Sequence, residues 1–422
     1  MCHHFRRLTG AGIRLIGYIC NMKKRLILLA AGALLLAAGC DRKVTLNEPN
    51  WDPRVREALD ALIADYGKGS PDYDPKCPPY AVFDFDNTTI INDIAQTLLV
   101  WQIENRAFSI TPDEMFRVLT ASIPDLDEDY GNGTTPRSLA TDLARDYAGL
   151  CQGADIGEMR AREEYRDFRA KMWYLSSNTD TSYPDSPFGC IWITTMLDGM
   201  SPEEVSALTR RSVDSWMGWD RMWKETWSSP DGQVSVEVPK GLAFTPEMKE
   251  LYGALRKAGF DVYVCSASYE GVVEAVACNE KYGLGLPEEN VFGIRLEASE
   301  DGLLHAVGDE GYPQPYRKGK VECIKEYIAS THGGRGPALV AGDSNGDYAM
   351  LTSFPDLKVG LIVNCLRNGN IGELAEAAMA DTSPVNLKGR KAPLYVVQGR
   401  NPDSLSFIPS PESLPVTVIE GR

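Results

Sequence analysis

The stretch AVFDFDNTT, residues 81–89, decides the fold of this chain. The apolar run at residues 80–85 has no helical period, which predicts a buried parallel strand. Asp84 and Asp86 follow at its carboxyl end, where open α/β sheets bind their ligands. Two carboxylates are costly to desolvate without a positive group, so the pair predicts a site for a divalent cation and a phosphoryl group. Taken alone, the pair would also fit turn or N-cap residues before the next helix.

Three later stretches favour the functional interpretation. A second apolar strand, residues 262–266, ends at the hydroxyl of Ser266, and Lys320 opens an amphipathic helix. A third strand runs into GDSNGD and ends in Asp343 and Asp347. An aspartate pair, a hydroxyl, a lysine and a second aspartate pair, in this order, resemble the four motifs of the haloacid dehalogenase superfamily. Lys318 is the alternative for the lysine, and Lys320 is preferred because it opens the helix with the apolar face.

This resemblance implies a role for each motif residue. Asp84 would be the nucleophile that forms an aspartyl-phosphate, and Asp86 the general acid and base. The intact Asp86 favours a phosphomonoesterase over a dehalogenase or a transport ATPase. Mg²⁺ would be held by Asp84, the backbone carbonyl of Asp86 and Asp343, while Asp347 would orient the lysine or a metal-bound water. The residues expected to bind phosphate oxygens are Thr88, Ser266 and Lys320. Ser266 and Asp347 would also fit ordinary caps of the segments that follow them.

The remaining sequence predicts an α/β fold, a doubly wound parallel sheet with an inserted helical domain. Strand and helix patterns alternate after residue 242, as in such sheets. The region between the first two motifs has helical patterns, and the resemblance implies a C1-type cap like that of the phosphoserine phosphatase branch. The expected divisions are a signal peptide at 1–40, a tether and helix at 41–79, a core at 80–95 and 242–410, a cap at 96–241, and a tail at 411–422.

The N-terminus has the pattern of an export signal. A basic segment after Met22 precedes an apolar run, residues 26–38, that is too short for an ordinary membrane-spanning helix. It ends in LAAGC, which resembles a bacterial lipoprotein signal with Cys40 as the lipidated residue. We therefore expect translation to start at Met22 and the chain to be lipid-anchored at the periplasmic face of the bacterial cell envelope. An ordinary cleaved signal or an inner-membrane anchor are the alternatives.

Composition limits the partners. The net charge of −16 argues against nucleic acid, whose phosphates need Lys and Arg. It does not exclude a phosphate ester, since a local metal and lysine set the sign of a site. The expected partners are a small phosphomonoester and the membrane, with no protein partner. Export permits disulfides, and Cys151 and Cys190 are the predicted pair.

The cap suggests the substrate. Asp93 occupies the position at which phosphoserine phosphatases carry a glutamate facing the substrate ammonium, so we expect a cationic headgroup. The cap is rich in aromatic residues, which either pack its core or form a box for quaternary ammonium. They are Trp101, Trp173, Tyr174, Tyr183, Trp192, Trp216, Trp219, Trp223 and Trp227.

Several short matches narrow the resemblance to the phosphorylcholine phosphatase group of exported bacterial enzymes. They are DFDNT, the Asn92-Asp93 pair, GMSPEEV at 199–205, Ser266-Ala267-Ser268 and VQGRN at 397–401. The function expected from the sequence is a Mg²⁺-dependent phosphomonoesterase acting on phosphocholine, with phosphoethanolamine or phosphoserine next. A phosphotransferase would share every residue. A lipoprotein that binds choline or phosphocholine without catalysis is the alternative from another class.

Overall fold

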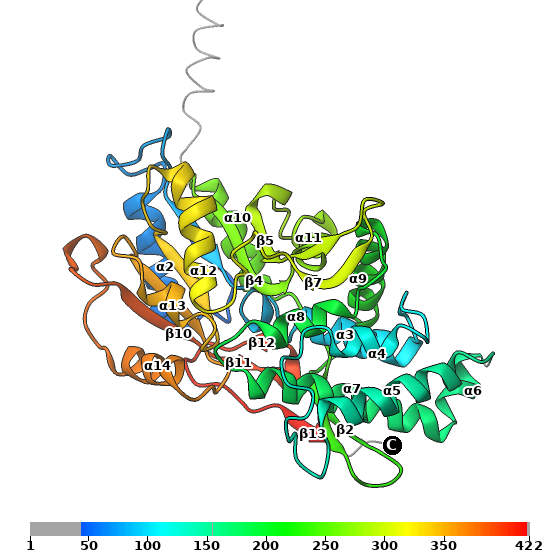
Figure 1. The fold of residues 1–422 in the computed structure, drawn as a ribbon. Coiled ribbons are helices and arrows are strands. Elements are labelled where there is room, and N and C mark those ends of the chain that lie inside the picture. Colours follow the sequence, from blue (N-terminus) through cyan, green and yellow to red (C-terminus); the bar gives the residue numbers. More distant parts are fainter. Residues whose placement is uncertain (1–43, 154, 420–422) are drawn as a thin grey trace, which may run out of the picture. The chain divides into compact units, whose positions relative to one another are not determined.

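The computed structural model describes residues 44–153 and 155–419 (Figure 1). The predicted signal peptide, the start at Met22 and the lipidation of Cys40 lie outside these residues. Within them, no helix is both long and apolar enough to cross a membrane.

A six-stranded parallel sheet forms the centre of the fold, in the order β10-β9-β8-β1-β4-β5. This confirms the predicted α/β fold class. The bounds are β1 (Tyr80–Phe83), β4 (Asp261–Tyr269), β5 (Val291–Ile294), β8 (Leu339–Gly342), β9 (Val359–Val363) and β10 (Leu394–Gln398). Every residue of β1, β8 and β9 is buried, because helices cover both faces of the sheet.

Two hydrophobic clusters, one on each face of the sheet, divide the residues of β1. Ala81 and Phe83 pack with α2 (Pro53–Tyr66) and α10 (Pro246–Lys257). Tyr80 and Val82 belong to the other cluster. Around it lie α12 (Lys318–Cys323), α13 (Tyr348–Thr352) and α14 (Asn370–Ala380). The alternation follows from the two-residue period of a strand. Helix α11 (Glu270–Ala277) packs beside β4 and β5.

The segment between β1 and β4 is mainly helical, as expected. Its helices are α3 (Ile94–Asn105), α4 (Met115–Thr120), α5 (Pro136–Leu150), α6 (Ile156–Arg160), α7 (Glu163–Ser182), α8 (Phe188–Thr195) and α9 (Pro202–Trp216). A hairpin of β2 (Trp223–Ser228) and β3 (Ser235–Lys240) follows. The helical pattern expected for this region does not continue to Trp227, because Trp223 and Trp227 lie on one buried face of β2.

The C-terminal segment does not end as a plain tail. β13 (Thr417–Ile419) pairs in parallel with β2, with Thr417 opposite Trp223. A strand this short has no period that sequence reasoning could detect. The other short strands form hairpins: β6 (Leu296–Ala298) with β7 (Leu304–Gly308), and β11 (Arg400–Asn401) with β12 (Ser406–Phe407).

The predicted disulfide is wrong. Cys151 and Cys190 are both free, as are the other described cysteines. Cys151 lies at the end of α5, whereas Cys190 is on α8 and lines the cavity described below. Their separate positions explain why the pair does not form.

Candidate active site

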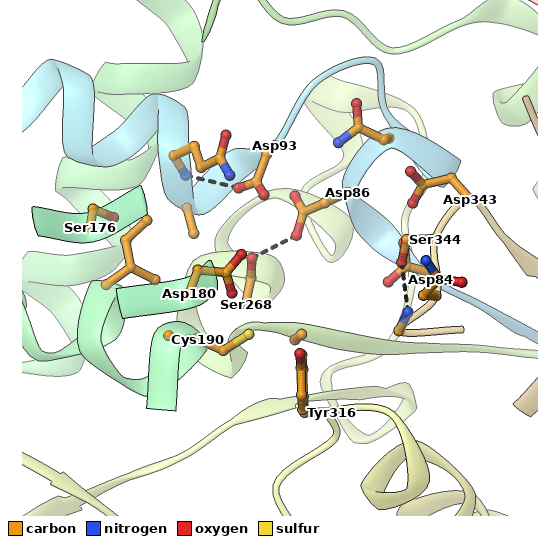
Figure 2. Close-up of a pocket in the computed structure, with 18 of the residues that line it drawn as sticks. Asp84, Asp86, Asp93, Ser176, Asp180, Cys190, Ser268, Tyr316, Asp343 and Ser344 are labelled. Atoms are coloured by element: carbon orange, nitrogen blue, oxygen red, sulfur yellow. Dashed lines mark hydrogen bonds between the residues drawn. The ribbon is translucent and has the colours of Figure 1, made fainter. Parts of the chain in front are cut away.

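The sheet register brings the predicted motifs to one edge. Phe83 pairs with Val264 on one side and with Ala341 on the other. The residues that follow these three positions therefore meet beyond the carboxyl ends of the strands, and they include Asp84 and Asp343. Figure 2 shows these side chains around a shared space.

A tight turn follows β1 and aims Asp84 and Asp86 at this space. It contains Asn87 at φ 58°, a left-handed conformation that asparagine tolerates better than most residues. The guanidinium of Arg400 donates to Oδ1 of Asn87 at 2.8 Å, and Arg400 is itself buried. An arginine from the distant C-terminal part of the chain thus holds the turn in place.

Lys320 joins two of the motif aspartates. Its Nζ donates to Oδ1 of Asp84 at 2.6 Å and to Oδ1 of Asp347 at 2.7 Å, with only 2% of its side chain exposed. Burial opposes the charged lysine, but Asp347 and Asp84 raise the pKa of Lys320 well above its ordinary value. Lys318, the alternative in the sequence, is exposed at the start of α12. The structure places Lys320 at the site.

Asp347 holds the loop after β8 as well as the lysine. Its Oδ2 accepts hydrogen bonds of 3.0 Å from the backbone N–H groups of Asp343 and Ser344, and one from the Ser344 hydroxyl. A Cβ at Gly342 would meet the Asp347 side chain at 2.4 Å, so glycine is required for this close approach. These contacts agree with the positioning role expected of Asp347.

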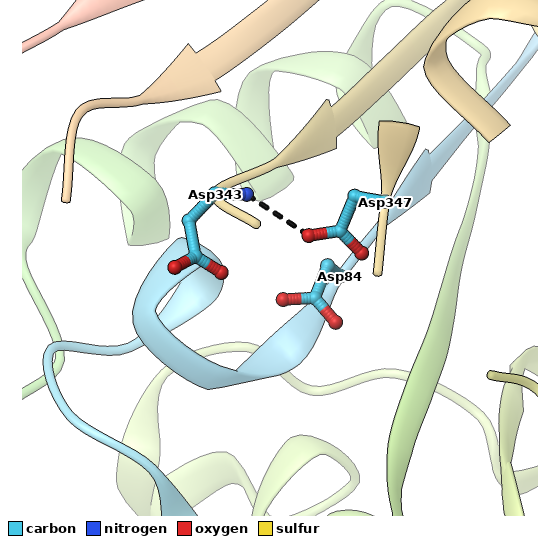
Figure 3. Close-up of side chains that lie close together, drawn as sticks. All are labelled: Asp84, Asp343 and Asp347. Atoms are coloured by element: carbon cyan, nitrogen blue, oxygen red, sulfur yellow. Dashed lines mark hydrogen bonds between the residues drawn. The ribbon is translucent and has the colours of Figure 1, made fainter. Parts of the chain in front are cut away.

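The carboxylates of Asp84, Asp343 and Asp347 each offer an oxygen within 4.8 Å of the others (Figure 3). All three are buried. Asp84 and Asp347 share Lys320, and Asp343 has only a 3.5 Å contact with Arg367, so the cluster is short of positive charge. Burial, followed by the charge of Asp347, raises the pKa of Asp84 well above its ordinary value, even with Lys320 opposing. Hard oxygen ligands with an uncompensated negative charge fit Mg²⁺. Because Asp347 is committed to Lys320 and the loop, Asp84 and Asp343 are the carboxylates left to bind a cation.

Asp86 lies beside Asp84 in a separate hydrogen-bond network. Its Oδ1 accepts from the N–H of Ile94 at 2.6 Å, and its Oδ2 accepts from the Ser268 hydroxyl at 2.6 Å. Burial, then the charge of Asp93, raises the pKa of Asp86 well above its ordinary value. A carboxyl that keeps its proton is what a general acid requires.

The predicted phosphate ligands are not equivalent in the structure. The Thr88 hydroxyl donates to Oδ2 of Asp84 at 3.1 Å, and the Ser266 hydroxyl lies 3.5 Å from Oδ2 of Asp86. Both hydroxyls are buried against the aspartates, whereas Lys320 also lines the open cavity. Ser268 was missed in the sequence, although the strand period places it on the same face as Ser266.

A cavity of about 480 Å³ opens in front of these groups. Its core side carries Asp84, Asp86, Lys320 and Asp343. Arg367, from the loop after β9, also lines it and lies 3.5 Å from Oδ2 of Asp343. Nothing in the sequence around Arg367 shows that its loop folds back over the site, so it was not predicted.

The cap forms the opposite wall. Asp93 caps α3 by accepting from the N–H of Gln96 at 2.8 Å, and burial raises its pKa to about 6. Asp180 on α7 and Cys190 on α8 face the same space and were not predicted as site residues. Among the cap aromatics named above, only Trp173 lines this cavity. An aromatic box built from the others is therefore not formed; Trp192, Trp216 and Trp227 are buried in packing.

Comparison with known proteins agrees with this geometry. The sequence model of the haloacid dehalogenase-like hydrolases matches residues 219–352, a range that includes Ser266, Lys320, Asp343 and Asp347. The chain is 26% identical over 359 residues to phosphorylcholine phosphatase of Pseudomonas aeruginosa, an alignment that covers 79% of this chain and 85% of that protein.

A solved structure has the same fold. It is a conserved protein of unknown function from Anaerococcus prevotii, 28% identical, and it superposes with a TM-score of 0.77 over 88% of this chain and 99% of its own. The match to the hydrolase family, the phosphatase relative and the assembled motifs lead to one conclusion. Residues 219–352 contain a haloacid dehalogenase-like hydrolase domain, and the chain as a whole is similar to a bacterial phosphatase.

Proposed function

We propose that this protein is a Mg²⁺-dependent phosphomonoesterase that works through an aspartyl-phosphate on a small substrate, with phosphocholine as the first candidate. The observation that carries the proposal is the buried contact of Lys320 with Asp84 and Asp347 at the edge of the sheet. It orients a carboxylate toward a cavity beside a second, proton-retaining carboxyl, Asp86.

The residues divide the reaction into two displacements. An oxygen of Asp84 attacks phosphorus, and the bond from phosphorus to the ester oxygen breaks. Asp86 gives its proton to the leaving alkoxide and then takes a proton from the water that attacks the phosphorus of the aspartyl-phosphate. Inorganic phosphate leaves and Asp84 is regenerated. Lys320 and Arg367 offset the negative charge of the transferring group.

Mg²⁺ would be held by Asp84 and Asp343, with the backbone carbonyl of Asp86 as the further ligand expected from the family motif. When bound, it supplies positive charge that stabilises the transferring phosphoryl group. The shortage of positive charge among the three buried carboxylates supports this assignment.

The substrate assignment rests on the phosphorylcholine phosphatase relative and on two carboxylates at the cap side of the cavity, Asp93 and Asp180. Phosphoethanolamine and phosphoserine carry an ammonium at a similar distance from phosphorus and are the next candidates. A phosphotransferase would use the same residues with an alcohol in place of water.

Phosphate release by the full chain tests the proposal. It is measured with and without Mg²⁺ on phosphocholine, phosphoethanolamine, phosphoserine and a sugar phosphate. We expect Mg²⁺-dependent release that is fastest on phosphocholine. Equal rates on all esters would remove the headgroup assignment but keep the phosphatase. Absence of release from every ester by folded protein with Mg²⁺ would refute the proposed function. Added alcohols that collect the phosphoryl group would favour the phosphotransferase.

The same proposal includes the cellular location of the protein and the role of its cap. A lipid anchor at Cys40 would hold the enzyme at the periplasmic face of the envelope, where exported phosphomonoesters are available. Residues 96–241 would act as the cap that selects substrate over the core at 80–95 and 242–410. Labelling with a radioactive fatty acid tests the anchor, since Cys40→Ser would abolish the label.

A further inference from the structure

Helix α7 presents one face to the active-site cavity. Trp173, Ser177 and Asp180 all line it, and their spacing of four and three residues places them on the same side of the helix. Figure 2 shows the Asp180 carboxylate directed into the space between Ser268 and the cap. Asp93 faces this space from the N-cap of α3, a different element. The two carboxylates therefore come from different elements and lie at the cap side of one cavity.

Asp180 is unfavourable for its own helix. It lies in the last turn of α7, where the helix dipole is negative and a basic residue would be favourable, but that turn has none. Within the described part of the chain, its carboxylate has neither a hydrogen bond nor an ion pair within contact distance. It also lies against Gly189, where a Cβ would meet its Oδ1 at 2.6 Å. The Asp180 side chain is exposed to the cavity, so its carboxylate is free to contact a ligand there.

The charges in the cavity are arranged in two groups. Its basic lining residues, Lys320 and Arg367, are at the core side, where they contact Asp84 and Asp343. Within the described residues, Asp93 and Asp180 form no ion pair, and the charges of Arg317 and Arg367 reach Asp180 only from a distance. The surroundings of the cavity raise the pKa of Asp180 by desolvation, while the charges of Arg317 and Arg367 oppose the shift. A substrate that bears a phosphate at one end and a positive group at the other matches this distribution.

The surface beside the two carboxylates is suited to a methylated cation. Trp173, Ile193 and Ala95 line the same side of the cavity. A quaternary ammonium has no N–H to donate, so it binds through long-range attraction to carboxylates and through contact of its methyl groups with aromatic and apolar surfaces. A primary ammonium would gain less from this surface.

We propose that Asp180 is a specificity-determining residue that, opposite Asp93, binds the quaternary ammonium end of the substrate. This inference rests on the proposed function for the identity of the substrate, but it makes its own claim about binding. Choline alone, without phosphate, should occupy this end of the cavity.

Isothermal titration calorimetry of choline into the full chain tests the claim, with ethanolamine as the second probe. Wild type should bind choline more tightly than ethanolamine. Asp180→Asn should raise the choline Kd at least about tenfold, since that factor corresponds to loss of one modest charge interaction. Asp113→Asn makes the same charge change at an exposed cap site and should leave the Kd unchanged. Asp180→Asn should unfold at the same or a higher temperature, because it removes an unfavourable charge from α7.

The outcomes separate the two proposals. Choline affinity that is equal in wild type and Asp180→Asn overturns the inference, and so does absence of choline binding by wild type. If wild type turns over phosphocholine while Asp180→Asn keeps its choline affinity, only this inference fails. The wild type could bind choline and hydrolyse no ester, while Asp180→Asn loses choline binding. In that case the ammonium site stands and the phosphatase proposal fails.

Discussion

At the level of single side chains, the active site contains more carboxylates than cations. Asp84 and Asp347 share Lys320, which is almost completely buried. Asp86 has no lysine or arginine partner and is held by neutral donors from Ile94 and Ser268. This difference in environment supports different roles for neighbouring aspartates: Asp84 lies beside the charge of Lys320 for attack, and Asp86 keeps a proton for transfer.

Replacing Asp86 tests its role as the acid. In Asp86→Asn, release of choline from phosphocholine should fall about 100-fold or more, because the alkoxide leaves without a proton. A nitrophenyl phosphate ester has a leaving group that needs no proton. It should still give a burst of nitrophenolate stoichiometric with enzyme, followed by slow turnover. Rapid-quench kinetics measure both. If Asp86→Asn slows the first step by the same factor on both esters, Asp86 is not the acid.

Replacing Lys320 tests its structural contribution. Lys320→Met leaves Asp84 and Asp347 buried without their cation, which should cost about 3–5 kcal/mol of unfolding free energy. Urea unfolding at neutral pH measures it. Lys318→Met, at an exposed position on the same helix, should change stability by less than about 0.5 kcal/mol. If the two variants are equally stable, the contacts of Lys320 with Asp84 and Asp347 do not stabilise the fold.

Most motif side chains could be predicted because each follows a strand or lies near the start of a helix, although α12 begins at Lys318 and not at Lys320 as expected. Asp84, Lys320, Asp343 and Asp347 lie together because adjacent parallel strands end at one edge. Arg367 could not be predicted, since its position depends on how a loop folds back. The roles of Thr88 and Ser266 as phosphate ligands stay predictions, because both hydroxyls contact aspartates here.

At the level of helices and strands, α11 carries a charge that makes stability depend on pH. Burial, then the charges of Glu270 and Glu288, raises the pKa of Glu274 to about 7. The folded state thus binds a proton more tightly than the unfolded chain does. Stability should therefore fall as pH rises from the ordinary glutamate pKa through about 7. Glu274→Gln should remove this loss and stabilise the protein at pH 8 by about 1 kcal/mol.

Thermal unfolding at two pH values measures the effect of Glu274→Gln. The gain in stability should be present at pH 8 and absent near pH 4. There the Glu274 carboxyl of the wild type is largely protonated in both the folded and the unfolded state. An equal gain at both pH values would show that the mutation acts through packing instead of charge.

The pairing of β13 with β2 connects the C-terminal segment to the cap. Removing residues 417–422 leaves β2 with one unpaired edge, because β13 is its partner on that side. We expect amide hydrogen exchange in β2 to increase at least about tenfold, with no change in β1. Mass spectrometry measures the exchange. Val418→Lys alters only an exposed side chain and should leave it unchanged. Unaltered exchange in the truncated chain would mean that β13 does not support β2.

For the whole molecule, the fold class could be predicted from the sequence. The parallel sheet and the helical insertion follow from alternating strand and helix patterns, and the structure confirms both. Strand order could not be predicted, because it depends on non-local pairing. The packing of cap aromatics could not be predicted either: Trp173 lines the cavity while Trp192 is buried, and nothing in their local sequences distinguishes them.

The central claim is that Asp84 becomes phosphorylated during turnover. The most direct measurement is acid quench of the enzyme with phosphocholine labelled in its phosphate, followed by peptide mapping. The account predicts a hydroxylamine-sensitive phosphate on the peptide that contains Asp84. It also predicts that the label depends on Mg²⁺ and is absent in Asp84→Asn. Turnover without any labelled peptide, or a label that persists in Asp84→Asn, would contradict it.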